Sequence, residues 1–195
     1  MALFRRLMRV FSGQIRHGGW SSANSIQTEN SACQADLNLM LQAVSLTNDY
    51  ISLEHGNENM FATLFFGVLD PATGDLCYIN GGHEPLYIIG RSGIRETLNS
   101  AGPAIGIIPG TKFEIRQSKI EPGNILIGYT DGVTEALSPR QKMYSKKRFH
   151  SLLEPCPSSA IELINRIKTD LFDHIDNAPQ FDDITMIAVH RKPAP

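Results

Sequence analysis

The sequence predicts an α+β protein in which helices cover antiparallel sheets. Between residues 60 and 130, short runs rich in β-branched and aromatic residues are joined by Gly-, Pro- and Asp-containing turns. Because no helix-length segment separates these runs, they favour hairpins over strand–helix–strand units. Helical periodicity precedes this region and returns after it, before one last apolar run at residues 184–190.

Two helices are expected before the strands. Residues 3–15 place apolar side chains at helical spacing with arginines on the other face, and Gly18-Gly19 ends the pattern. Residues 18–32 are polar and predict a loop. The second helix is expected over residues 35–53, with one shared apolar face made of Leu37, Leu41, Val44 and Ile51.

The strands follow from alternating apolar runs and the turns between them. The turns are DPATGD, RSG and the Pro122-Gly123 pair, whose residue types suit tight chain reversals. The expected strands lie at residues 62–70, 76–80, 86–90, 94–98, 112–120, 124–130 and 184–190.

A further helix is expected before the last strand. Ser159 and Glu162 have the spacing of a capping box, which marks a helix start. The apolar stripe expected on this helix consists of Ile161, Ile164, Ile167 or Lys168, Leu171 and Ile175.

Length and charge limit the possible classes of protein. We expect one domain over residues 1–195, in which 1–59 is helical with a polar loop and 60–192 holds the sheet core, the C-terminal helices and the last strand. Eighteen basic residues against 20 acidic ones give a net charge of −2. This balance disfavours a nucleic-acid partner, which selects a strongly basic face. No apolar run approaches the ~20 residues of a membrane-spanning helix.

The three cysteines predict neither a zinc site nor a disulfide framework. Cys33, Cys77 and Cys156 are widely spaced and form no CxxC pair. Reduced thiols and a cytoplasmic location are therefore expected.

Two acidic clusters flank apolar strands. Asp131 directly follows the run ending at Thr130, and Asp182 and Asp183 directly precede the run that begins at Ile184. Carboxylates at strand ends are held by a rigid scaffold, and their oxygens suit hard cations such as Mg2+ or Mn2+. The alternative is that each Asp simply bonds backbone amides beside a turn or caps a helix.

Two glycine-rich segments are further candidates for a functional site. In NGGHEP, Gly81 and Gly82 allow close approach of another chain or a phosphate, and His83 could exchange a proton near neutral pH. A single histidine in a turn is otherwise structural. The segment AGPAIGIIPG lacks the lysine of a nucleotide-binding P-loop and predicts a loop at a sheet edge.

Taken together, these motifs resemble the SpoIIE-type, RsbU-like branch of the metal-dependent PPM serine/threonine phosphatases. The resemblance is carried, in order, by MFATLFFGVLDPATGDLCYINGGHEPL, AGPAIGIIPG, IEPGNILIGYTDGVTEA and QFDDITMIAV. It implies an αββα sandwich of two antiparallel sheets flanked by helices. It also implies that Asp131 and Asp182 ligate Mn2+ or Mg2+, with Asp183 ranked second to Asp182, and that a metal-activated water attacks the phosphorus of the substrate.

The chain departs from the family pattern at its start. The acidic GDYYD-like motif and the GDVSGKG motif, which supplies the metal-bridging Asp, do not occur, so the domain is expected to be N-terminally short. Either the sequence is a fragment of a longer protein, or it is complete and has lost the bridging carboxylate. Missing strands would leave sheet edges unpaired, which favours association with another chain, such as a homodimer.

The leading functional hypothesis is a phosphatase acting on phosphoserine or phosphothreonine of a bacterial regulatory protein, such as an anti-anti-sigma-type factor. The alternative is a catalytically impaired phosphatase-like binding module in a partner-switching pathway. A receiver-like phospho-acceptor would also place an Asp at a strand end, but receivers alternate strands and helices around a parallel sheet.

Overall fold

The structure is a computed structural model that describes residues 29–56 and 60–193. The predicted helix at 3–15 and most of the predicted loop at 18–32 lie outside the described residues. The helices are α2 (Glu29–Glu54), α3 (Asp131–Thr134), α4 (Lys146–Ser151) and α5 (Ala160–Ile175). The strands are β1 (Leu64–Leu69), β2 (Asp75–Gly81), β3 (Leu86–Gly90), β4 (Gly93–Leu98), β5 (Arg116–Lys119), β6 (Ile125–Tyr129) and β7 (Met186–His190).

These strands form two sheets, one of three strands in the order β1-β2-β5 and one of four in the order β4-β3-β6-β7. The predicted α+β class with two antiparallel sheets and flanking helices is confirmed. The chain divides into two compact units. The prediction of one domain over residues 1–195 stays a prediction.

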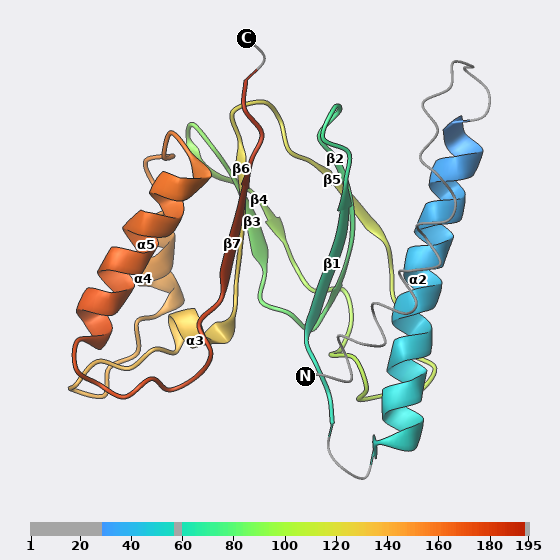
Figure 1. The fold of residues 1–195 in the computed structure, drawn as a ribbon, viewed down its shortest axis with the longest axis horizontal. Coiled ribbons are helices and arrows are strands. Elements are labelled where there is room, and N and C mark those ends of the chain that lie inside the picture. The colour runs from blue at the N-terminus through green and yellow to red at the C-terminus, as the bar shows by residue number, and fades with distance from the viewer. Residues whose placement is uncertain (1–28, 57–59, 194–195) are drawn as a thin grey trace. The chain divides into compact units, whose positions relative to one another are not determined.

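Among the described residues, the first unit comprises 29–56, 60–68, 77–83 and 100–117. Helix α2 lies along the three-stranded sheet (Figure 1). As predicted, Leu37, Val44 and Ile51 share its buried face, and Leu41 packs against the same cluster. The helix begins at Glu29, so the predicted loop was wrong for residues 29–32.

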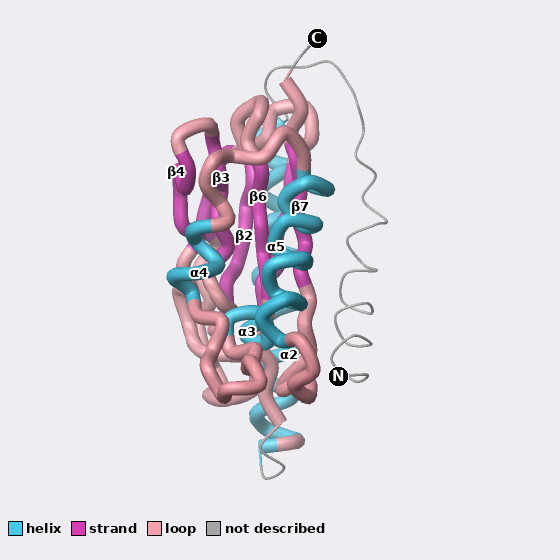
Figure 2. Tube along the Cα trace, turned by 90° about the vertical axis from the view of Figure 1, so that its left-hand side faces the viewer, coloured by secondary structure: helices cyan, strands magenta, loops and turns pink. Residues whose placement is uncertain are grey.

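The second unit comprises residues 69–76, 84–99 and 118 onward. Strands β3 and β6 lie at the centre of the four-stranded sheet, and helices α4 and α5 pack over one face of it (Figure 2). At the aromatic centre of this core, Tyr87 stacks on Tyr129, and Phe149 lies tilted against Tyr129 with ring centroids 4.3 Å apart. This rigid sheet carries the acidic turns described below.

Helix α5 begins as predicted, because the Ser159 side chain accepts a hydrogen bond from the Glu162 backbone N–H at 3.1 Å. The returning contact is shifted by one residue, since the Glu162 carboxylate accepts from the Ser158 N–H at 2.8 Å. The predicted apolar stripe was wrong at Ile161, which is 75% exposed. The buried stripe is instead Leu163, Ile167, Leu171 and Ile175.

Candidate functional site

The pairing of β6 with β7 brings the two acidic turns to the same end of the four-stranded sheet. The strands are antiparallel, and Tyr129 is opposite Met186. Asp131 follows β6 by two residues, and Asp183 precedes β7 by three. Residues 51 positions apart in the sequence, Asp131 and Asp182, therefore belong to adjacent segments.

Thr130 links these segments through three hydrogen bonds. Its backbone N–H donates to the Thr185 carbonyl at 3.0 Å. Its hydroxyl donates to the Asp183 carbonyl at 2.8 Å and accepts from the Thr185 N–H at 2.9 Å. The link between the strands thus continues past the end of β6.

At Gly132 the backbone of the Asp131 turn lies against that of the Asp182-Asp183 segment. A Cβ atom at this position would lie 2.6 Å from the Asp183 carbonyl oxygen and 3.3 Å from the carbonyl carbon of Asp182. A side chain here would force the backbone of one segment to move. The TDG motif therefore needs glycine at position 132 because the Asp182-Asp183 segment of the same chain lies against it.

The three carboxylates at these turns are exposed to solvent. Asp131 is the first residue of the short helix α3, and its Oδ1 accepts from the Gly132 N–H at 3.0 Å. The Oδ1 of Asp182 accepts from the Asp183 N–H at 2.7 Å. These bonds to backbone amides are those expected of an Asp beside a turn, and they orient the side chains without covering them.

The donor chemistry of this site fits a hard divalent cation, because it offers carboxylate oxygens in water-accessible positions. Within residues 29–56 and 60–193, however, no three His, Cys, Asp or Glu side chains gather as a metal cage. A cation held by Asp131 and Asp182 or Asp183 would thus keep several water ligands. Their role as ligands stays a prediction.

His83 lies in the first unit, whereas the acidic turns belong to the second. Its backbone N–H donates to the side chain of buried Asn80 at 3.0 Å. The close approach predicted at Gly82 is to the chain itself, because a Cβ there would meet the Ala104 nitrogen at 2.6 Å. The two predicted glycine-rich loops therefore pack against each other.

Sequence reasoning missed the charged pair of Glu84 and Lys146, whose carboxylate and ammonium groups are 2.8 Å apart. This hydrogen bond raises the pKa of Lys146. The Tyr129 hydroxyl also donates to Glu84, at 3.5 Å. Burial raises the pKa of Tyr129, with further contributions from Tyr87 and Glu84, so the phenol stays protonated. Only the position of Glu84 directly after His83 could have drawn attention to it.

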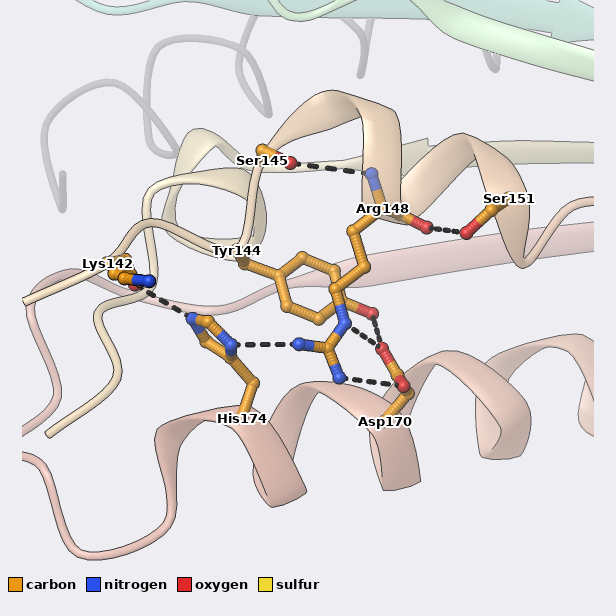
Figure 3. Close-up of polar contacts among 7 residues, drawn as sticks. All are labelled: Lys142, Tyr144, Ser145, Arg148, Ser151, Asp170 and His174. Atoms are coloured by element: carbon orange, nitrogen blue, oxygen red, sulfur yellow. Dashed lines mark hydrogen bonds and ion pairs between the residues drawn. The ribbon is translucent and has the colours of Figure 1, made fainter. Parts of the chain in front are cut away.

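A polar network joins α4 to α5 and was also missed (Figure 3). Arg148 bonds both oxygens of Asp170, at 2.8 and 2.9 Å, and the Tyr144 hydroxyl donates to the same carboxylate at 2.6 Å. Burial and the bond to Asp170 raise the pKa of Tyr144. His174 Nδ1 lies 2.9 Å from Arg148 Nη1, and Nε2 lies 2.9 Å from the Lys142 carbonyl.

Backbone hydrogen bonds connect this network to the turn that contains Asp131. The Tyr144 N–H donates to the Ala136 carbonyl, and the Ser145 N–H donates to the Thr134 carbonyl, both at 2.9 Å. Thr134 is the last residue of α3, which Asp131 begins. The network therefore anchors the return segment that follows α3.

Comparison with known proteins gives consistent results. The family model of Stage II sporulation protein E (SpoIIE) matches residues 21–192. The chain is 48% identical to protein IcfG of Synechocystis, over 98% of this chain and 31% of IcfG. It is 25% identical to the phosphoserine phosphatase RsbU of Bacillus subtilis, over 69% of this chain and 40% of RsbU. The chain thus spans less than half the length of either relative.

Solved structures share the fold at low sequence identity. The SiaA-PP2C domain of Pseudomonas aeruginosa matches with a TM-score of 0.68 and 17% identity, covering 97% of this chain and 69% of that one. The RsbU and RsbW domains of Rv1364c from Mycobacterium tuberculosis give 0.64 and 23%, covering 100% and 49%. The SpoIIE phosphatase domain of B. subtilis gives 0.55 and 16%, covering 90% and 78%.

Proposed function

Because this chain belongs to the SpoIIE family of PPM-type phosphatase domains, we propose that it contributes to metal-dependent hydrolysis of phosphoserine or phosphothreonine on a protein. The observation that carries this proposal is the junction of the Asp131 turn with the Asp182-Asp183 segment at one end of the sheet. These are the acids that the family resemblance selects from the sequence.

In this proposal, Asp131 and Asp182 hold Mn2+ or Mg2+, and Asp183 is the second choice for the position of Asp182. A bound cation of this kind lowers the pKa of a coordinated water and neutralises charge on phosphoryl oxygens. The chain's own contribution is to present exposed carboxylates from a rigid strand pair. A cysteine nucleophile is not required.

The proposed substrate is a phosphorylated bacterial regulator of the anti-anti-sigma type, in the cytoplasm. The likeness to RsbU, which is named a phosphoserine phosphatase, supports this choice. Among the described residues, no helix has both the length and the apolar character needed to cross a bilayer.

We also propose that the edge of the four-stranded sheet can pair with another chain, for example in a homodimer. β7 is the terminal strand in the sheet order, and Ile187 on it is 62% exposed. An unpaired strand edge with an exposed apolar side chain favours association. Sedimentation of the wild type against Ile187→Lys tests this, and identical monomeric profiles contradict it.

A second candidate function is a phosphatase-like binding module without activity. It is favoured by the incomplete set of metal-binding side chains among the described residues. Such a module would bind the phosphorylated regulator and leave its phosphate in place.

Phosphate release from a phosphoserine protein in Mn2+ separates the two candidates. The assay compares this chain with a chimera that adds, at its N-terminus, a region carrying the GDYYD-like and GDVSGKG motifs of the family, each also as Asp131→Asn and Asp182→Asn. Each variant of the active form should lose at least 10-fold in rate, a loss on the order of that caused by removing one interaction at a metal site. Asp173→Asn, an exposed acid on α5, serves as the control and should retain activity. If neither form exceeds its Asp131→Asn background, the enzymatic proposal is wrong and the binding module stands.

A further inference from the structure

We propose that Thr130 is a positioning residue whose hydroxyl sets the separation between Asp131 and the Asp182-Asp183 segment, and thereby the affinity for a divalent cation. This inference rests on the proposed metal-binding role of these acids. It concerns a side chain that has no ligand role of its own.

The hydroxyl of Thr130 accepts in place of the Thr130 carbonyl, which instead accepts from the Val133 N–H at 3.0 Å. In an antiparallel ladder, every second opposed pair exchanges two backbone hydrogen bonds, and the register puts Thr130 and Thr185 at such a position. Here Thr130 and Thr185 make only one of these, from the Thr130 N–H to the Thr185 carbonyl. The Thr185 N–H donates instead to Thr130 Oγ1, at 2.9 Å. The side chain thus closes the strand pair where the backbone ladder ends.

The same hydroxyl has a second partner. It donates its only proton to the Asp183 carbonyl at 2.8 Å, so it acts as donor and acceptor at once. Valine has nearly the same shape but can do neither. Serine can do both.

The residues on either side of Asp131 both contact the Asp183 carbonyl. The Thr130 hydroxyl donates a hydrogen bond to this carbonyl. The Gly132 backbone lies so close to the same oxygen that a Cβ atom would not fit between them. We call this arrangement the Thr130–Gly132 clasp. It sets the relative position of two acidic segments that would otherwise be joined only through their strands.

A cation site needs this restraint because the carboxylates repel one another when the cation is absent. The clasp opposes that repulsion with bonds to the backbone. Mg2+ in particular demands near-ideal geometry, so a small separation of the segments weakens binding. The bonds lie in a partly exposed region where water can replace them, so their loss should leave the fold intact.

Mn2+ titration by calorimetry tests the inference without an activity assay. Thr130→Val should weaken the affinity by about 10- to 100-fold, as expected for a residue that orients a metal ligand. Thr130→Ser should bind within about 3-fold of wild type. Thr97→Val is the matched control, because Thr97 is an exposed threonine on β4, at the opposite edge of the same sheet. Circular dichroism and thermal melts establish that each variant is folded.

Gly132→Ala provides a second variant should Thr130→Val fail to fold, and it should also weaken binding because its Cβ displaces Asp183. Asp131→Asn distinguishes failure of the clasp inference from failure of the proposed ligand role of Asp131. If Asp131→Asn loses binding and Thr130→Val or Gly132→Ala binds as wild type does, the clasp inference is overturned and the ligand role stands. If Asp131→Asn binds as wild type does, or wild type does not bind, the ligand role fails and the inference fails with it.

Discussion

Asn48 lies fully buried on α2, where its amide group holds the loop that follows Ile105. Its Oδ1 accepts from the Gly106 N–H, and its Nδ2 donates to the Ile108 carbonyl, both at 2.9 Å. The neighbouring Asp49 accepts from the Gly110 N–H at 2.8 Å. One turn of α2 thus fixes the course of the AGPAIGIIPG loop.

Replacing Asn48 by Ala should lower the free energy of unfolding by about 1–3 kcal/mol, because it leaves a buried backbone N–H without its acceptor. Urea denaturation measures this loss. Gln42→Ala, at an exposed position of the same helix, is the control and should change stability by less than about 0.5 kcal/mol. Equal effects of the two substitutions would show that the Asn48 bonds contribute nothing.

At the scale of elements, α4 and α5 are joined by the Arg148–Asp170 ion pair and the Tyr144 hydroxyl. The bond from Arg148, followed by that from Tyr144, holds the pKa of Asp170 below its usual value of 3.8. The folded state therefore favours the ionised carboxylate. Its contribution to stability is present above the unfolded-state pKa and is lost as the pH falls through that value toward the lower folded pKa.

Asp170→Asn should accordingly reduce the stability difference between pH 5 and pH 3 that the wild type shows. Urea midpoints measured across this range test the prediction. Asp173→Asn, an exposed acid one turn along α5, should leave the acid dependence close to that of wild type. The same slope in Asp170→Asn and wild type would contradict the assigned role of the pair.

Each of the seven strands in the described part of the chain overlaps a predicted one, because residues that favour tight turns bound the apolar runs. The run at 112–120 is a strand only over Arg116–Lys119. The sequence did not predict α3 or α4, since four and six residues are too few to show a helical period. On α5 two apolar stripes overlap, and only the tertiary structure selects the one containing Leu163 over the one containing Ile161. Periodicity shows that a helix has an apolar face but does not fix its rotation about its axis.

The candidate site shows the same limit. Asp131, Asp182 and Asp183 could be chosen individually from their places at strand ends, and the family resemblance joined them. The hydrogen bonds of Thr130, the Glu84–Lys146 pair and the Arg148 network depend on pairing between distant residues, which single-sequence patterns do not encode.

At the scale of the whole molecule, cation binding should be coupled to folding. A ligand that binds only the native state adds about 2.7 kcal/mol to the free energy of unfolding at 100 times its dissociation constant. Mn2+ should therefore raise the melting temperature, EDTA should reverse the rise, and Asp131→Asn should abolish it. A rise of equal size in Asp131→Asn would place the bound cation elsewhere.

The link from Thr130 to Thr185 also has a consequence for the order of events during synthesis. The two residues are 55 positions apart, with α3, α4 and α5 between them. At about 5–20 residues per second, a ribosome completes Thr185 several seconds after Thr130. During that interval a nascent chain carries Asp131 with no partner segment, so its acidic turn remains unassembled until β7 arrives. Cation binding would then report on arrival of that last strand.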